Sequence, residues 1–251
     1  MRRKQIAGEK DTLTTAQIQF FKENGYLILD NFLEHAIVER WQQAMCRSFG
    51  VGSKDEDFSG KKGQDFKFTA ESSLGNHFRL FKVLKQLAGG TVEFASEDLI
   101  IIRPMSEEEW SMPRRGHIDR FLPSYRSRFM VGLTTYAYEV LPKGGGTIIW
   151  PKSHITNWEY FQAFPDHHYC NSPEGGTGAV HERLTQRAPC EPVEFTAKPG
   201  TVILWHSFML HTASLNTNRT PRMGIFCRWG QPLQPEQPRE TFDDIWEHWT
   251  V

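Results

Sequence analysis

The stretch PGTVILWHSFMLHTASLNTNRTPR, residues 199–222, joins an apolar run to two histidines and an arginine. Its run VILWH follows a Pro-Gly pair and consists of β-branched, aliphatic and aromatic residues, a composition typical of a buried strand. The second half is rich in Asn, Thr and Pro, which is typical of a turn. The stretch therefore predicts a strand that ends near His206, a segment that carries His211, and a turn that returns the chain at Arg222.

Similar strand-like runs surround this stretch, and Gly or Pro residues separate them. They are TVEFASEDLIIIRP (91–104), FMVGLTTYAYEV (129–140), GGTIIWP (145–151), VEFTAKPG (193–200) and PRMGIFCRWG (221–230). We expect no long helix to interrupt them. The pattern predicts a mainly β fold with flanking helices, in which an antiparallel barrel or a two-sheet jelly roll protects its strand edges.

Helical spacing of apolar residues precedes the strand-rich region. It predicts helices near residues 13–24, 34–49 and 76–90. Thr14 is a suitable N-cap for the first helix, and Gly25 and Gly50 follow the ends of the first and second.

Three further segments are less regular. Residues 51–68 are charged and predict a solvated loop, with a substrate lid as the second interpretation. Residues 156–192 predict an insertion over one mouth of the barrel, and ETFDDIWEHW (240–249) predicts a short helix. The simplest organisation is one domain over residues 1–251, with N-terminal helices (13–90) packed on a jelly-roll core (91–230).

Composition narrows the function classes. With a formal net charge of -1, the chain lacks the basic excess that would indicate a nucleic acid or an anionic membrane as partner. No apolar run reaches membrane-spanning length, and no signal peptide pattern precedes the fold. The 4 cysteines are far apart, which argues against a thiolate zinc site and for reduced thiols. We therefore expect a cytoplasmic protein.

The stretch RRGHIDRF (114–121) contains the first group of possible metal ligands. In an extended segment, His117 and Asp119 project to the same side, so that an imidazole and a carboxylate can reach one cation. Alone, such a pair is usually a solvated surface feature. A second histidine would complete the facial triad of two His and one carboxylate that binds non-haem Fe(II) and leaves positions open.

Either His206 or His211 could supply that second histidine. Arg222 follows His211 by eleven residues and lies beyond the turn, so it can return beside the strand end that carries His211. A guanidinium there can hold a carboxylate bidentately, which a lysine does less well. This spacing favours His211, and we interpret His206 as a structural histidine at the barrel end.

Four stretches resemble, in order and spacing, the phytanoyl-CoA dioxygenase family of Fe(II)/2-oxoglutarate-dependent oxygenases. They are LTTAQIQFFKENGYLIL, GHIDRF, GGGTIIWPKSHI and PGTVILWHSFMLHTASLNTNRTPR, which together extend over about residues 13 to 230. The resemblance implies a double-stranded β-helix (cupin-like) barrel. One departure is that Ala213 stands where the family usually has serine, with Ser214 one residue later, so the resemblance does not support a serine contact to the cosubstrate, whereas Asn216 fits the family pattern.

The resemblance also implies the roles of individual residues. His117, Asp119 and His211 would bind the iron, and Arg222 would bind the C5 carboxylate of 2-oxoglutarate. Three hydroxyls are candidates for the same cosubstrate, those of Thr134, Thr135 and Thr147. Arg120 is the candidate for contacting an acidic substrate at the mouth. His154 and the histidines of DHHYC (166–170) are interpreted as structural or solvated.

The activity implied is hydroxylation of an unactivated C–H bond in a small molecule, such as a natural product of secondary metabolism, with O₂ consumed, succinate and CO₂ released, and ascorbate assisting in vitro. Asp119 argues against halogenation, because related halogenases have a small residue there and bind halide in its place. The alternatives are desaturation, cyclisation or another oxidative rearrangement at the same iron centre, and a barrel that binds a ligand or metal without turnover. We expect a monomer or homodimer.

Overall fold

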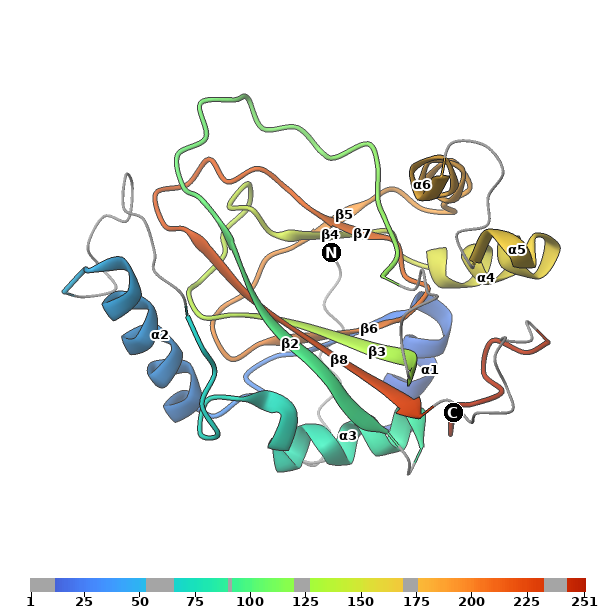
Figure 1. The fold of residues 1–251 in the computed structure, drawn as a ribbon, viewed down its shortest axis with the longest axis horizontal. Helices are drawn as coiled ribbons and strands as arrows, with labels where there is room; N and C mark the ends of the chain where they lie inside the picture. The colour runs from blue at the N-terminus through green and yellow to red at the C-terminus, as the bar shows by residue number, and fades with distance from the viewer. Residues whose placement is uncertain (1–11, 53–65, 90–91, 120–126, 169–175, 233–242) are drawn as a thin grey trace.

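The computed structural model describes residues 12–52, 66–89, 92–119, 127–168, 176–232 and 243–251 (Figure 1). The loop predicted over residues 51–68 therefore falls mostly outside the described residues, as does Arg120.

The N-terminal helices form where sequence spacing predicts them. They are α1 (Thr15–Asn24), α2 (His35–Phe49), the short 3₁₀ helix η1 (Leu74–Asn76) and α3 (Phe78–Ala88). Thr14 and Gln17 form a reciprocal capping box at the start of α1, and Gly25 ends it in the left-handed conformation with φ 76°. Gly50 ends α2 in the same way. The caps predicted at Thr14, Gly25 and Gly50 are confirmed.

Two antiparallel sheets face each other. The larger has the order β1 (Tyr26–Leu29), β6 (Val202–His206), β3 (Ser127–Tyr136), β8 (Arg222–Pro232), β2 (Glu93–Ile102). The smaller has the order β5 (Val193–Phe195), β4 (Thr147–Ile149), β7 (His211–Ala213). Figure 1 shows the smaller sheet above the larger and α3 below it. The predicted jelly-roll class with flanking helices is confirmed.

The two faces of the larger sheet carry different kinds of side chain, because side chains alternate along a strand. On β8, Met223, Ile225 and Cys227 pack into the apolar core beneath the helices. Arg222 and Arg228 stand at even-numbered positions of the same strand, and therefore on the inner face, toward the smaller sheet. This alternation brings charged groups into the barrel while the core beneath the sheet stays apolar.

Three helices occupy the region predicted as an insertion. They are α4 (Ser153–Ala163), α5 (Pro165–His168) and α6 (Gly176–Gln186). The expectation that no long helix interrupts the strands is therefore wrong. On α4 the buried stripe combines Tyr160 and Phe161 with the polar Ser153 and Asn157, so an apolar period is not visible in the sequence.

The C-terminal residues 243–251 form turns against the helical layer. Trp246 N–H donates to the Asp244 side chain at 2.9 Å, and Thr250 N–H donates to the Leu87 carbonyl at 2.9 Å. The helix predicted at residues 240–249 is therefore wrong over its described part, because a local side-chain hydrogen bond replaces the helical pattern there. None of the described helices is both long and apolar enough to span a membrane.

Candidate metal centre

His117 and His211 lie directly opposite each other in an isolated β-bridge between the segment after β2 and the start of β7. Each backbone N–H donates to the other residue's carbonyl at 2.9 Å, so the two Cβ atoms leave the bridge on the same side. Asp119 follows His117 by two residues and returns to that side. The backbone therefore brings together three side chains that are up to 94 positions apart in sequence.

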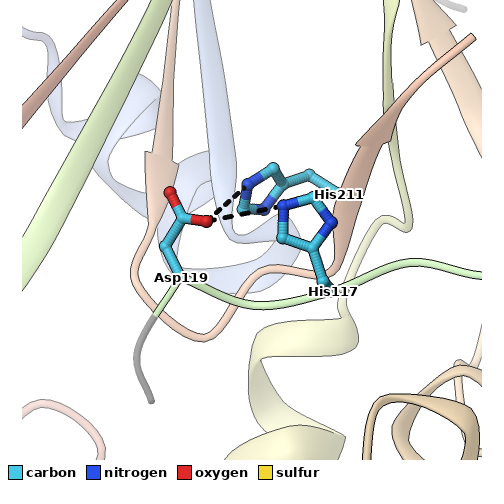
Figure 2. Close-up of side chains that lie close together, drawn as sticks. All are labelled: His117, Asp119 and His211. Carbon is cyan, nitrogen blue, oxygen red and sulfur yellow. Dashed lines mark ion pairs between the residues drawn. The ribbon is translucent and has the colours of Figure 1, made fainter. Parts of the chain in front are cut away.

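One oxygen of Asp119 faces both imidazoles (Figure 2). Asp119 Oδ1 lies 3.5 Å from His117 Nε2 and 3.3 Å from His211 Nε2. One ligand atom from each of the three side chains lies within 4.8 Å of the others. Neighbouring donors around an octahedral ion, each about 2.1 Å from it, are roughly 3 Å apart. Both contacts of Asp119 Oδ1 are close to this spacing, and two imidazole nitrogens with one carboxylate oxygen are donors that suit a divalent transition metal with open positions.

The electrostatic surroundings keep Asp119 ionised. Burial opposes the charge, but His211, His117 and Arg228 hold the pKa of this carboxyl well below its usual range. Arg228 Nε donates to Asp119 Oδ2 at 2.8 Å and Nη2 donates to the same oxygen at 2.5 Å. The carboxylate is thus charged and ready to bind a cation through Oδ1.

The His211 ring is oriented by its surroundings. Nδ1 lies 3.0 Å from the Met209 carbonyl, which can only accept, so Nδ1 donates this hydrogen bond and Nε2 is the ring atom that faces Asp119. Trp205 packs against the ring with centroids 4.5 Å apart. The imidazole is therefore held with Nε2 toward the side that Asp119 faces.

Arg222 lies inside the barrel and is only 1% exposed. Its Nε donates to the Gly145 carbonyl at 2.9 Å and its Nη1 to the Ile100 carbonyl at 3.1 Å. Burial lowers the pKa of this guanidinium, and the nearby Tyr136 opposes that effect. No described residue accepts a hydrogen bond from Nη2, so this buried cation retains donor capacity for an anionic ligand.

The three threonines predicted near the cosubstrate are not equivalent. Thr147 lies 3.2 Å from the Tyr136 hydroxyl, which belongs to the surroundings of Arg222. Thr134 Oγ1 accepts from Trp205 Nε1 at 3.2 Å, on the inner face of β3. Thr135 points to the opposite face and donates to the Thr201 carbonyl at 2.8 Å. The structure therefore brings Thr134 and Thr147 to the barrel interior and does not bring Thr135 there.

The histidines interpreted as structural lie away from the metal centre. His206 stacks on Trp249 at 4.6 Å with ring planes 14° apart, on the helical side of β6. His154 Nε2 donates to the Lys22 carbonyl at 3.0 Å. His167, from the DHHYC stretch, contacts the Tyr160 hydroxyl at 2.7 Å, and Cys170 of that stretch lies outside the described residues. Among the described residues, the group that could hold a metal contains His117, Asp119 and His211 and none of these histidines.

Ser214 and Asn216 are occupied by the turn that leads to β8. Ser214 Oγ donates to the Gly146 carbonyl at 3.2 Å and also lies 3.2 Å from Glu194 Oε1. Asn216 Nδ2 donates to the Thr220 carbonyl at 2.8 Å. Both side chains therefore shape the backbone around Arg222.

Sequence reasoning missed Arg228 and Tyr136, although a signal for both was present. Arg228 follows Arg222 by six positions on one strand, and Tyr136 follows Thr134 by two on another. An even spacing puts both residues of a pair on the same face. Once Arg222 and Thr134 are placed inside the barrel, the period of two predicts the same for their partners.

Comparisons with known proteins bear on the family and the fold. The family model for phytanoyl-CoA dioxygenase (PhyH) matches residues 21–224. A search of curated protein sequences finds no match.

Several solved structures share the fold at low sequence identity. The non-heme alpha ketoglutarate dependent carbocyclase SnoK from nogalamycin biosynthesis has TM-score 0.59 and 17% identity, with 87% of this chain and 84% of SnoK covered. The epimerase SnoN in complex with Fe3+, alpha ketoglutarate and nogalamycin RO has TM-score 0.56 and 14% identity, with 86% and 82% covered. EctD from S. alaskensis with bound Fe has TM-score 0.57 and 19% identity, with 87% and 77% covered.

Proposed function

Because the chain belongs to the phytanoyl-CoA dioxygenase family, we propose that it hydroxylates an unactivated C–H bond of a small molecule, with His117, Asp119 and His211 as its iron ligands. The chain is a non-haem iron, 2-oxoglutarate-dependent oxygenase. The single observation that carries the residue assignment is the position of Asp119 Oδ1, 3.5 Å and 3.3 Å from the two histidine Nε2 atoms.

Arg222 is the anchor proposed for the far carboxylate of 2-oxoglutarate. Its guanidinium is buried in the barrel, and a buried cation is stabilised when an anion pairs with it. Thr147 and Tyr136 are beside it and supply hydroxyl groups. Thr134, on the same inner face, is the less direct candidate, and the orientation of Thr135 gives no support for a cosubstrate contact.

When bound, Fe(II) supplies the oxidising chemistry that couples 2-oxoglutarate and O₂ to C–H cleavage, with succinate and CO₂ as coproducts. The side chains of this protein orient the reactants. Asp119 remains ionised, His211 keeps Nε2 toward the centre, and Arg222 fixes the cosubstrate at its other end. The apolar core around Trp205 and Met209 excludes water from the closed end of the barrel.

A second candidate function is oxidative cyclisation or epimerisation at the same centre. The similar structures include one described as a carbocyclase and one described as an epimerase. The mass of the product distinguishes the two candidates, since hydroxylation adds one oxygen atom whereas ring closure removes two hydrogens and epimerisation leaves the mass unchanged.

The test is oxygen-dependent conversion of 2-oxoglutarate to succinate, measured with Fe(II) and ascorbate, first without and then with a panel of small molecules. We expect slow uncoupled turnover by the wild type and its loss in Asp119→Ala and His211→Ala. His35→Ala is the matched control, because the His35 side chain is 85% exposed and lies outside the triad. Retention of turnover by either triad variant contradicts the assignment.

A further inference from the structure

The two carboxylate oxygens of Asp119 have different partners, and Arg228 contacts only one of them. Its Nε and Nη2 both donate to Oδ2, at 2.8 and 2.5 Å. Both imidazoles instead face Oδ1. The side chains of Arg228 and Asp119 are only 17% and 14% exposed, so water competes little for these hydrogen bonds.

Arg228 is itself fixed from its other side. Nη1 donates to Asp98 Oδ2 at 3.0 Å and reaches Ser96 Oγ at 3.5 Å. Both partners stand on β2, which pairs with β8 along its length, and Ser96 is directly opposite Arg228 in the register. The guanidinium is therefore tied to the sheet on one side and holds the Asp119 carboxylate on the other.

We propose, on the basis of the proposed function, that Arg228 is a positioning residue that makes Asp119 a one-oxygen metal ligand. A carboxylate that binds through both oxygens occupies two positions around a metal, whereas a triad enzyme needs its remaining positions for 2-oxoglutarate and O₂. Hydrogen bonds from Arg228 to Oδ2 oppose rotation of the carboxylate and keep one position open.

Removal of the hydrogen bonds from Arg228 to Asp119 Oδ2 has two consequences that can be measured separately. Loss of a side chain that orients a metal ligand typically weakens metal affinity about 10- to 100-fold. A carboxylate free to turn also competes with 2-oxoglutarate for the metal. Arg228→Met should therefore weaken Co(II) binding to the metal-free protein, and it should also weaken binding of 2-oxoglutarate to the Co(II) protein.

A series of variants separates positioning from simple structural support. Arg228→Lys keeps the charge but not the two-donor fork, so its Co(II) affinity should lie between those of the wild type and Arg228→Met. Asp98→Asn leaves Arg228 on Asp119 and removes only an ion pair whose carboxylate side chain is 55% exposed, so its effect should stay within about fivefold.

Arg79→Met is the matched control. The Arg79 side chain is 20% exposed and pairs with Glu34 at 3.3 Å, which makes it similar in burial and pairing to Arg228 but remote from the triad. Its variant should lose thermal stability without any change in Co(II) affinity. If Arg228 had only a structural role, Arg228→Met would likewise lose thermal stability and keep its Co(II) affinity.

The experiment is titration of the metal-free wild type and variants with Co(II), followed by visible absorption, and then titration of the Co(II) proteins with 2-oxoglutarate. Weaker binding of both by Arg228→Met, with the order wild type, Lys, Met, supports the proposal. Wild-type affinities in Arg228→Met overturn it, and if that variant does not fold, wild-type affinities in Arg228→Lys overturn it. Failure of the wild type itself to bind metal contradicts the proposed function instead.

Discussion

The guanidinium of Arg222 lies over the α-carbon of Gly224, two residues along the inner face of β8. A Cβ atom at position 224 would collide with Arg222 Nη1. Because Gly224 has no side chain, the guanidinium of Arg222, the proposed cosubstrate anchor, can occupy the space beside it.

Gly224→Ala should displace the Arg222 guanidinium and raise the KM for 2-oxoglutarate at least tenfold, because a charge-assisted hydrogen-bond pair worth roughly 1.5–3 kcal/mol is misaligned. Steady-state kinetics with varied 2-oxoglutarate measures this. Gly178→Ala in α6 is the control, since its Cβ would meet only the end of the flexible Arg115 side chain at 3.1 Å. Equal KM values for both variants would refute the role of Gly224.

Arg222→Lys tests the anchor itself. Lysine retains a cation but loses the planar fork that matches a carboxylate, so we expect a KM for 2-oxoglutarate about tenfold or more above wild type. Metal affinity should not change, because Arg222 is not among the triad residues. A variant with normal KM would remove Arg222 from the cosubstrate site, and one with weakened metal binding would assign it a different role.

Thr185→Val should weaken the support of the metal-ligand segment by α6. Thr185 Oγ1 accepts from the buried Gly116 N–H at 3.2 Å and donates to the His181 carbonyl at 2.7 Å. Valine has nearly the same shape, but it leaves the Gly116 N–H without its acceptor, at a cost of about 1–3 kcal/mol in the free energy of unfolding. Denaturant unfolding measures this loss.

The control for that variant is Thr156→Val. Thr156 Oγ1 donates to the Ser153 carbonyl at 3.2 Å within its own helix and accepts from no backbone N–H in the described part of the chain. Its unfolding free energy should change by less than about 1 kcal/mol. Equal losses in the two variants would show that the contact with Gly116 contributes nothing specific.

His154 should make folding stability depend on pH. Burial lowers its pKa from 6.5 to about 4, whereas the unfolded chain titrates near 6.5. Between these values the unfolded state binds more protons, so stability is complete above about pH 6.5 and falls as the pH approaches 4. The shift corresponds to a loss on the order of 3 kcal/mol at the acid end.

Replacement of His154 by glutamine should flatten this part of the stability curve, because the amide does not titrate but can still donate to the Lys22 carbonyl. Chemical denaturation between pH 4 and pH 7 gives the slopes. His35→Gln is the control for the loss of a histidine, since the His35 side chain is 85% exposed. Parallel curves for all three proteins would show that His154 is not buried in its neutral form.

The sequence predicted the strands and the helix caps because those depend on local rules. Thr14, Gly25 and Gly50 act within one turn of chain, and alternation along β8 follows from strand geometry. The pairing of His117 with Asp119 was also local. The choice of His211 over His206 depended on the eleven-residue spacing between His211 and Arg222, which is not a local feature. The structure places His206 on the helical side of β6, against Trp249.

The features that were missed depend on tertiary contacts. The buried stripe of α4 contains Ser153 and Asn157, whose side chains bond to backbone atoms of Leu210 and Phe208, so only the fold explains why polar residues are buried there. The period of two along β8 places Arg228 inside the barrel, but its contact with Asp119 could not be predicted, because the two residues are 109 positions apart.

The central claim is that His117, Asp119 and His211 hold one iron and that Arg222 holds the far end of 2-oxoglutarate. The most direct measurement is a crystal structure of the protein grown anaerobically with Fe(II) and 2-oxoglutarate, with the metal located by anomalous scattering at the iron edge. We predict one iron peak bonded to both Nε2 atoms and to Asp119 Oδ1, with the C5 carboxylate on the Arg222 guanidinium. An iron bound elsewhere, or a cosubstrate whose C5 carboxylate does not contact Arg222, would contradict the account.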